Sequence, residues 1–448
     1  MPKVIIIGGG LAGLAAAAAL ASLRFQVEIL ESRAFLGGRA TSWPANAPAS
    51  SPGNPEADST ELLDNCQHVL MRCCVNLLDF YRRLGVAESI RFHRTFYFIE
   101  PGGRVSTLKR GILPAPAHFA GSFLGMDCLG PGDKFAIARA MLAIRREHAR
   151  PELDQITMMQ WLQRHHQTPL AIERFWRQVL VSAINEELDR MAAAHGLQVF
   201  WLGMLARPDS YEMGVPAVPL RDLYREDLWQ RIGNVTLRPR TPVTEVDTGR
   251  GNVTGVRAGE KYFAADYYIC ALPFERLPGV VPDLGLTTHN WQHSPITGIH
   301  LWFDRPITSL PHATLLDRTI QWMFNKSEGR YIQLVVSASR SLVEMSRADV
   351  IALAVRELAD FFPEVTNATL ERAHVVKELR ATFSARPGME ALRPLPKTIY
   401  GNFFLAGDWT RTGWPATMEG AVRSGYAAAD ALLEKSGRSP EFLLKDIA

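Results

Sequence analysis

The sequence predicts an α/β protein of at least two domains, one of which contains a parallel sheet. Residues 4–7 form a β-branched run, and a glycine cluster and an alanine-rich segment follow it directly. Such a strand, buried on both faces and leading through a turn into a helix, is typical of parallel sheets. A second apolar run, which ends in Gly407-Asp408, lies near the other end of the chain. At 448 residues the chain is roughly three times as long as an average domain.

The composition excludes several classes of protein. With 47% hydrophobic and 21% charged residues, the chain is neither disordered nor collagenous. The net charge of +3 is spread without long like-charge runs, so we expect no nucleic-acid partner, while a pI near 8.6 permits contact with anionic membranes. The five cysteines include no paired CxxC spacing, which favours a reduced, cytoplasmic location.

Residues 4–23 carry no charge and are long enough for a membrane span or a signal peptide. Their internal order favours a β-turn-α unit instead, because a lipid-facing span seldom contains four glycines within six residues. No other stretch of the sequence is long and apolar enough to cross a bilayer.

The glycine cluster fits the dinucleotide-binding fingerprint of Rossmann-like folds. In Gly8-x-Gly10-x-x-Gly13 the glycines allow a tight turn, close approach of a pyrophosphate, and close packing of helix on strand. Leu11 and Ala12 begin the helix, whose first backbone N–H groups bind phosphate. A second strand, residues 26–30, ends at Glu31, 23 residues after Gly8, where a carboxylate can accept hydrogen bonds from a ribose. The alternative is that the glycines only form a turn before an ordinary helix and that Glu31 has no part in binding a dinucleotide.

Residues 32–39 continue with Ser32 and an R-x-x-x-G-G-R element made of Arg33, Gly37, Gly38 and Arg39. This element resembles that of the flavin amine oxidase and carotenoid desaturase superfamily. The resemblance implies a Rossmann-like FAD-binding domain of the GR2-type amine oxidase fold, with paired glycines and an arginine close to the diphosphate. It favours FAD over NAD. The alternative for Arg39 is a solvated surface cation.

The C-terminal region carries a second part of the same resemblance. The strand ending in Gly407-Asp408 is followed by a segment that opens the last helix near Met418, with Pro415 expected in its first turn. In the superfamily, this Asp binds the ribityl or diphosphate part of FAD and the helix N-terminus faces the flavin. A residue placed like Val243 pairs with the adenine through its backbone. Because no cysteine follows Cys270, we expect noncovalent FAD. The alternative for Asp408 is a plain turn cap.

The same reading predicts that the FAD domain is discontinuous, with pieces at 1–84, 231–275 and 397–448. The substrate domain would then comprise a hairpin and helical cap, 85–230, and a sheet, 276–396. Within these pieces the patterns predict an exposed loop at 43–60, helices at 71–84 and 346–362, and a hairpin at 95–108. They also predict two groups of strands: a first group at 235–246, 252–257 and 262–270, and a second group at 298–303, 319–324, 331–337 and 373–383.

Two motifs narrow the resemblance. The D-N-x-Q-H run at residues 64–68 and the L-A-G-D-W-T to S-G run at residues 405–425 resemble the hydroxysqualene dehydroxylase family of hopanoid pathways. Membership would imply reductive removal of an allylic hydroxyl from a C30 isoprenoid, with hydride from reduced FAD and an external electron donor. Cys66 departs from the family's glycine and either lines the flavin face or fills volume.

Hydroxide is a poor leaving group, so this reaction requires an acid in a dry pocket. His68 is the first candidate, with Asp64 or Asn65 orienting it or the flavin; the alternative is a core histidine with satisfied hydrogen bonds. Further titratable candidates are Glu186 and His300. The pocket should be apolar, and five residues of the predicted second sheet are expected in its wall: Trp302, Phe303, Trp322, Met323 and Phe324.

Three alternatives remain open from the sequence. The first two are a carotenoid desaturase and an amine oxidase of the same fold, which take hydride from the substrate. The third is a prenyl-lipid escort protein without flavin chemistry. Because squalene-like substrates partition into lipid, peripheral contact with the inner face of the membrane is a further expectation.

Overall fold

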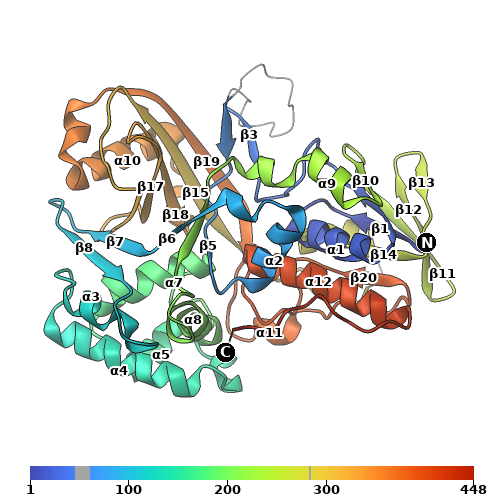
Figure 1. The fold of residues 1–448 in the computed structure, drawn as a ribbon, viewed down its shortest axis with the longest axis horizontal. Helices are drawn as coiled ribbons and strands as arrows, with labels where there is room; N and C mark the ends of the chain where they lie inside the picture. Colours follow the sequence, from blue (N-terminus) through green and yellow to red (C-terminus); the bar gives the residue numbers. More distant parts are fainter. Residues whose placement is uncertain (46–60, 282–283, 448) are drawn as a thin grey trace.

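A computed structural model describes residues 1–45, 61–281 and 284–447. It has a parallel sheet with flanking helices on one side and a mixed sheet above a group of helices on the other (Figure 1). The predicted α/β class with a mixed-sheet and helical second part is confirmed. Residues 46–60 of the predicted loop lie outside the described residues, and Trp43 and Pro44 belong to a strand, β3.

The first sheet is parallel throughout and joins segments from both ends of the chain. Its strand order is β10 (Val235–Arg238), β2 (Gln26–Leu30), β1 (Lys3–Ile7), β14 (Tyr267–Cys270) and β20 (Phe403–Leu405). The β-branched residues of β1 are buried on both faces: Val4 and Ile6 lie in a cluster with the N- and C-terminal helical segments, and Ile5 and Ile7 lie in a second cluster. The carboxyl ends of β1, β2 and β20 therefore meet at one edge, where ligands of open α/β sheets bind.

Helix α1 (Leu11–Ser22) is the N-terminal apolar segment, and all its residues up to Ala21 are buried. It packs against α12 (Met418–Lys435), where Gly425 permits close contact: a Cβ there would lie 2.2 Å from the Ala12 carbonyl oxygen. The prediction of a β-turn-α unit is thus confirmed. No helix within the described ranges combines the length and apolarity needed to cross a membrane.

The second large sheet is mixed and has seven strands. Its order is β19 (Leu370–Phe383), β15 (His293–Phe303), β18 (Tyr331–Ser337), β17 (Trp322–Ser327), β16 (His312–Leu315), β7 (Thr95–Ile99) and β8 (Val105–Lys109). Helix α10 (Arg347–Phe361) covers one face of this sheet through a buried cluster that includes Leu301, Met323 and Leu334. Side chains alternate between faces along each strand, so the residues between these turn away from α10.

Several helices and three small sheets complete the fold. The helices are α2 (Val75–Leu84), α3 (Ala120–Leu124), α4 (Pro131–Glu147), α5 (Met158–Arg164), α6 (Pro169–Ala171), α7 (Arg177–Ile184), α8 (Ala193–Phe200), α9 (Glu226–Ile232) and α11 (Met389–Leu392). The small sheets pair β3 (Ser42–Pro44) with β4 (Leu62–Asp64), β5 (Leu70–Met71) and β6 (Ile90–His93) with β9 (Met213–Pro216), and β11 (Glu245–Gly249) with β12 (Asn252–Ala258) and β13 (Lys261–Phe263).

Some predicted element boundaries are wrong. The strand predicted over 235–246 is two strands in different sheets, β10 and β11, and that over 262–270 is β13 followed by β14. Both predictions merged apolar runs across a loop, because strand propensity does not register a change of sheet.

At helix ends the errors have local causes. Helix α2 begins at Val75, not Met71, because Leu70–Met71 pair with β9. Pro415 precedes the first turn of α12, whose N-cap is Thr417. Strand β16 was not predicted.

Candidate active site

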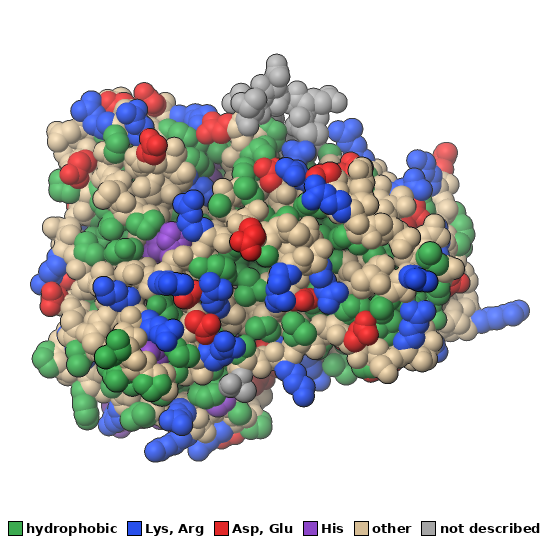
Figure 2. Space-filling model, in the orientation of Figure 1, with side chains coloured by type: hydrophobic (Ala, Val, Ile, Leu, Met, Phe, Trp, Pro, Cys, Tyr) green, Lys and Arg blue, Asp and Glu red, His purple; other side chains and the backbone are tan. Residues whose placement is uncertain are grey.

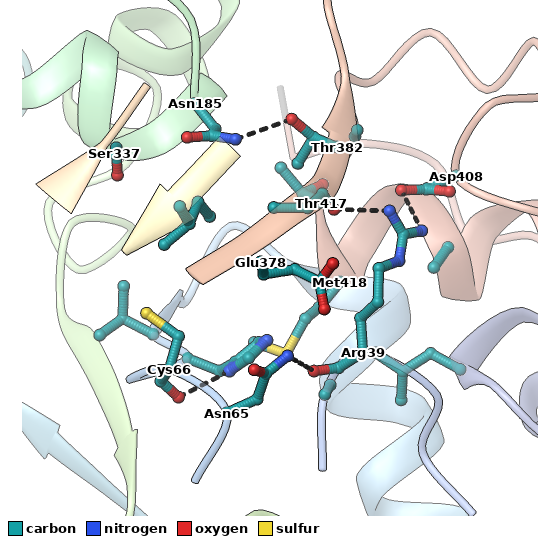
Figure 3. A pocket seen from close by; sticks show the side chains of 18 of the residues that line it. Arg39, Asn65, Cys66, Asn185, Ser337, Glu378, Thr382, Asp408, Thr417 and Met418 are labelled. Atoms are coloured by element: carbon teal, nitrogen blue, oxygen red, sulfur yellow. Dashed lines mark hydrogen bonds and ion pairs between the residues drawn. The ribbon is translucent and has the colours of Figure 1, made fainter. Parts of the chain in front are cut away.

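A long cavity extends from the carboxyl edge of the parallel sheet to the face of the seven-stranded sheet that lies opposite α10. At the first end, backbone and polar groups line it; at the second, the lining is mostly apolar. Figure 3 shows the middle of the cavity, where Arg39, Asn65, Cys66, Glu378 and Met418 approach one space from separate segments of the chain.

The β1–α1 turn needs its glycines for different reasons. Gly8 has φ +106°, and a Cβ there would lie 2.9 Å from the Ala271 carbonyl oxygen. A Cβ on Gly13 would lie 2.0 Å from the Gly8 carbonyl oxygen, so only glycine lets the helix pack this closely. At Gly10, by contrast, the nearest atom is 3.9 Å away, and the open space beside it is the cavity.

The N-terminus of α1 forms one end of the cavity. Gly10 is its N-cap, no side chain caps it, and the first turn contains no acidic residue. Gly10, Leu11 and Ala12 line the cavity, so the free N–H groups and the positive end of the helix dipole are available to an anion. This arrangement fits a diphosphate.

Glu31 lines the cavity beside this helix start. Its carboxylate accepts hydrogen bonds from the Gly9 N–H (2.7 Å), the Arg33 N–H (2.7 Å) and the Ser32 hydroxyl (3.1 Å). These donors hold the carboxylate at the carboxyl end of β2, and Ser32 and Arg33 also line the cavity. These hydrogen bonds therefore fix the carboxylate that is predicted to bind the ribose beside the β1–α1 turn.

The paired glycines bring a second backbone segment to the same place. Gly37 and Gly38 have φ of +98° and +63°, and Gly37 forms a bridge with Gly10. Arg39 then donates to Asp408 Oδ2 (2.7 Å) and to the Ala381 carbonyl oxygen (2.5 Å). Interaction with Asp408 raises the pKa of Arg39 against the effect of its burial. The alternative of a solvated surface cation is wrong.

Asp408 and the start of α12 close this end of the cavity. Gly407 has φ +143°, and a Cβ there would lie 2.3 Å from Trp409 Nε1, so the strand must end in glycine. Thr417 accepts the Gly420 N–H at the N-cap of α12, and Met418 is the first helical residue. Gly407, Asp408 and Met418 were predicted as cofactor-binding residues, and all three line the cavity together with Thr417.

Val243 lies in the loop after β10, two residues beyond Thr241, whose N–H donates to the Glu31 carbonyl oxygen (2.7 Å). It is half-buried and packs against the core rather than lining the cavity. Its backbone contact with adenine stays a prediction.

The segment 65–68 crosses the middle of the cavity. Asn65 donates to the Arg39 carbonyl oxygen (3.0 Å), which ties it to the dinucleotide end, and its own Oδ1 is buried without a partner. Burial raises the pKa of the Cys66 thiol to about 12, so this thiol is not a reactive thiolate at neutral pH. Cys66 and Gln67 both line the cavity.

His68 also lines the cavity and is half-buried. Its Nδ1 lies 2.9 Å from the Cys66 carbonyl oxygen, which can only accept, so Nδ1 carries the proton. Burial lowers the pKa of His68 below 6.5, so at neutral pH the ring is uncharged and Nε2 is a hydrogen-bond acceptor. To act as an acid, His68 must first be protonated at Nε2.

The structure does not bring Asp64 to the cavity lining. Its Oδ1 accepts from the Ser42 hydroxyl (2.7 Å) and the Leu220 N–H (3.0 Å), and its Oδ2 pairs with Lys326 Nζ (3.1 Å). Lys326 also donates to Gln67 Oε1 (2.9 Å). Asp64 thus fixes the start of the 65–68 segment through its hydrogen bonds, and its interaction with His68 is only a long-range electrostatic one.

We expect Lys326→Met to lower the thermal unfolding midpoint of the FAD-bound protein. It leaves the Asp64 carboxylate, 4% exposed, without its cation, a loss worth about 3–5 kcal/mol for a buried pair. The double variant D64N/K326M should recover part of this loss. The control is Lys397→Met, which breaks an exposed pair with Glu434 and should have little effect. A double variant as unstable as the sum of both singles would contradict this role.

The seven-stranded sheet supplies the apolar wall. Trp322 and Phe324 line the cavity, as predicted, and Trp322 Nε1 donates to the Ser182 hydroxyl (2.6 Å). Phe303 and Met323 do not, because strand alternation turns them into the core under α10. Trp302 lies farther along β15, stacked on Tyr331 with ring centroids 4.4 Å apart and covered by Arg372.

Two other titratable candidates are also outside the cavity lining. Glu186 is completely buried and paired with Arg340 (2.7 Å), and His300 donates to or accepts from the Tyr331 hydroxyl (2.8 Å) within the sheet. The sequence reading missed cavity residues that come from distant elements: Phe96, Phe98, Leu108, Gln178, Ser182, Asn185, Thr314, Val335, Glu378 and Thr382. No local motif marks these positions, because each lies on an otherwise ordinary strand or helix or, for Asn185, at the C-cap of α7.

These residues fit FAD. A helix start without a side-chain cap, an anchored carboxylate, paired positive-φ glycines and the Arg39–Asp408 pair converge on one end of a long cavity. The fold and this site define the class of protein: a dinucleotide-binding flavoprotein with an apolar substrate chamber.

Comparison with known proteins gives the family. The sequence pattern described as "Flavin containing amine oxidoreductase" matches residues 11–433. The chain therefore belongs to this family, is a flavin-dependent oxidoreductase, and uses FAD as its cofactor. This finding excludes the predicted alternative without flavin chemistry.

Relatives and solved structures resemble the chain over nearly its full length. A probable zeta-carotene desaturase of Synechococcus elongatus is 26% identical, covering 96% of this chain and 98% of its own. A 15-cis-phytoene desaturase of the same organism is 23% identical, covering 97% and 96%. Among solved structures, an oxidoreductase from Methanosarcina mazei has a TM-score of 0.71 at 15% identity, covering 96% and 100%. Putrescine oxidase has 0.70 at 15%, covering 96% and 98%; these structures show the fold.

Proposed function

We propose that this enzyme reductively removes the allylic hydroxyl of hydroxysqualene, a C30 isoprenoid, to give squalene. The observation that carries the proposal is the apolar chamber that continues from the dinucleotide end of the cavity. Its wall is mostly aromatic and aliphatic, as a hydrocarbon substrate requires, with polar side chains such as Gln178, Ser182 and Thr314 among them.

The floor of the chamber can be followed across the sheet. Gly298 on β15 pairs with Val335, Val335 with Trp322, Trp322 with Thr314, and Thr314 with Phe98. Neighbouring strands lie about 4.8 Å apart, so this row spans about 19 Å. It begins beside the Asn65–Cys66 segment, because a Cβ on Gly298 would lie 3.2 Å from the Asn65 carbonyl oxygen. The part of an extended isoprenoid chain on one side of the reacting carbon fits along such a floor, starting next to His68.

The reaction replaces a C–O bond by a C–H bond. The cavity end formed by the α1 N-terminus, Glu31 and the Arg39–Asp408 pair would hold reduced FAD, which would supply the hydride and be restored by an external electron donor. His68, as the imidazolium, would give the proton from Nε2 to the departing hydroxyl, which leaves as water. The Cys66 carbonyl oxygen orients the ring by accepting from Nδ1, and the apolar wall excludes bulk water, which strengthens the proton transfer.

A second candidate is desaturation of a carotenoid precursor. Two observations favour it: relatives named as desaturases cover almost the whole chain, and His68 at neutral pH offers Nε2 as an acceptor, which suits a base. The two candidates move hydride in opposite directions and are therefore separable.

The test is anaerobic. The purified yellow protein is photoreduced, hydroxysqualene is added, and the flavin absorbance and the extracted lipids are followed. The proposal expects oxidised flavin to return with one equivalent of squalene. Flavin that stays reduced, together with bleaching of the oxidised enzyme by a phytoene-like polyene, would instead establish the desaturase.

A further inference from the structure

One end of the molecule exposes large apolar side chains on neighbouring elements. Ile112 is fully exposed (101%), Phe135 is 72% exposed and Leu124 is 67% exposed. Leu113 and Leu142 are 46% and 58% exposed. These five residues, from the β8–α3 connection, α3 and α4, are called the α3–α4 surface below.

Hydrogen bonds hold these elements together as one unit. The Ser122 hydroxyl of α3 donates to the Lys109 carbonyl oxygen (2.7 Å) and accepts its N–H (3.0 Å), which ties α3 to β8. Lys134 of α4 donates to the Leu124 carbonyl oxygen (2.7 Å), which ties α4 to α3. The exposed apolar side chains therefore belong to one ordered surface.

Helix α4 has two different faces. Ala136, Ile137, Ala140 and Ile144 are buried, whereas the outer face carries apolar and cationic side chains at helical spacing: Phe135, Arg139, Leu142 and Arg146. An apolar stripe interleaved with Lys and Arg is typical of helices that lie in a membrane interface.

The charge of this region is mostly positive. Residues 104–146 contain seven Lys or Arg and two Asp, whereas the whole chain has a net charge of only +3. Figure 2 shows hydrophobic side chains mixed with Lys and Arg at its lower left, where Figure 1 places α3 and α4. Cores of protein interfaces are depleted of charge, so this mixture fits a lipid surface better than a protein partner.

We propose that the α3–α4 surface docks on a bilayer containing anionic phospholipids, with its apolar side chains among the acyl chains and its cations at the phosphates. Leu108 of β8 lines the substrate chamber, and Ile112 and Leu113 of the surface follow in the connection after β8. A lipid-soluble substrate would thus reach the chamber beside the membrane. The docking does not depend on which isoprenoid reacts.

The test is flotation of the FAD-bound protein with vesicles of phosphatidylcholine alone or with phosphatidylglycerol. The protein should float with the anionic vesicles, and salt should weaken this binding. The variant I112S/L124S/F135S should lose at least tenfold in vesicle affinity. R145Q/R146Q should lose roughly fivefold for each cation removed.

The matched control is L392S/L395S/I399S, which removes three side chains exposed to a similar degree (63%, 57% and 67%) on and after α11. It should bind vesicles like the wild type, and all variants should retain the flavin spectrum, which reports folding. Equal loss in the control, or unchanged flotation of I112S/L124S/F135S, would overturn the proposal. So would a wild-type dimer that only the I112S/L124S/F135S variant dissociates, because the surface would then bind a second copy.

Discussion

Replacement of Gly10 by valine is expected to give a folded protein that purifies without FAD. Gly10 has φ −78° and ψ 176°, which any residue adopts, and a Cβ there meets nothing closer than 3.9 Å. The valine side chain would therefore stand in the space that the α1 N-terminus offers to the diphosphate. We expect at least a hundredfold loss of FAD affinity, measured by titration of the apoprotein and by absorbance at the flavin maximum.

Two further glycine variants sharpen this prediction. Gly132→Val makes the same change in the first turn of α4, in open space away from the cavity, and should leave FAD bound. Gly13→Ala should fail differently, because its Cβ would lie 2.0 Å from the Gly8 carbonyl oxygen, and soluble protein should be lost. A yellow Gly10→Val protein with normal FAD affinity would show that the diphosphate lies elsewhere.

Replacement of His68 by glutamine is expected to slow reoxidation of the reduced enzyme by hydroxysqualene about 10²–10⁴-fold, the range for loss of a general acid. The pKa of His68 is lowered below 6.5, so the imidazolium forms only as the pH falls through that lowered pKa. The single-turnover rate of the wild type should therefore rise toward acidic pH, and H68Q should lack this rise. FAD affinity should not change.

The pH profile also separates the two candidate functions. A desaturase that uses neutral His68 as a base would lose rate as the pH falls, which is the opposite sign. His93→Gln is the control, since burial lowers the pKa of His93 as well, but this residue is outside the cavity lining. It should keep the wild-type profile. A wild-type rate independent of pH between 5 and 8 would exclude both roles of His68.

The dinucleotide end could be predicted because its chemistry is local. The turn at Gly8–Gly13, the acid at Glu31 and the Gly37–Gly38 pair each depend on backbone geometry within a few residues, so spacing alone reveals them. Asp408 lies far along the chain, but it too is predicted by a local pattern, an apolar strand that ends in Gly-Asp. Its ion pair with Arg39, across 369 positions, is a tertiary contact that no spacing shows.

The substrate end could be predicted only in part because a strand's two faces look alike in sequence. Trp302, Phe303, Trp322 and Phe324 are all aromatic residues in strands, yet only the last two line the chamber. The choice depends on which face α10 covers and on how far along the strand the residue lies.

Asp64 illustrates a different limit of the sequence. Its motif resembles a catalytic one, but both of its carboxylate oxygens bind partners from three other segments: Ser42, Leu220 and Lys326. These contacts give Asp64 a structural role. A motif identifies a residue without identifying its contacts.

The most direct test of the proposed reaction is one anaerobic turnover of the reduced enzyme with hydroxysqualene in D₂O. The flavin N5 hydrogen exchanges with solvent, so reductive dehydroxylation predicts squalene carrying one deuterium at the carbon that held the hydroxyl. Recovery of unchanged hydroxysqualene, or of squalene without deuterium, would contradict hydride delivery from the flavin to this substrate.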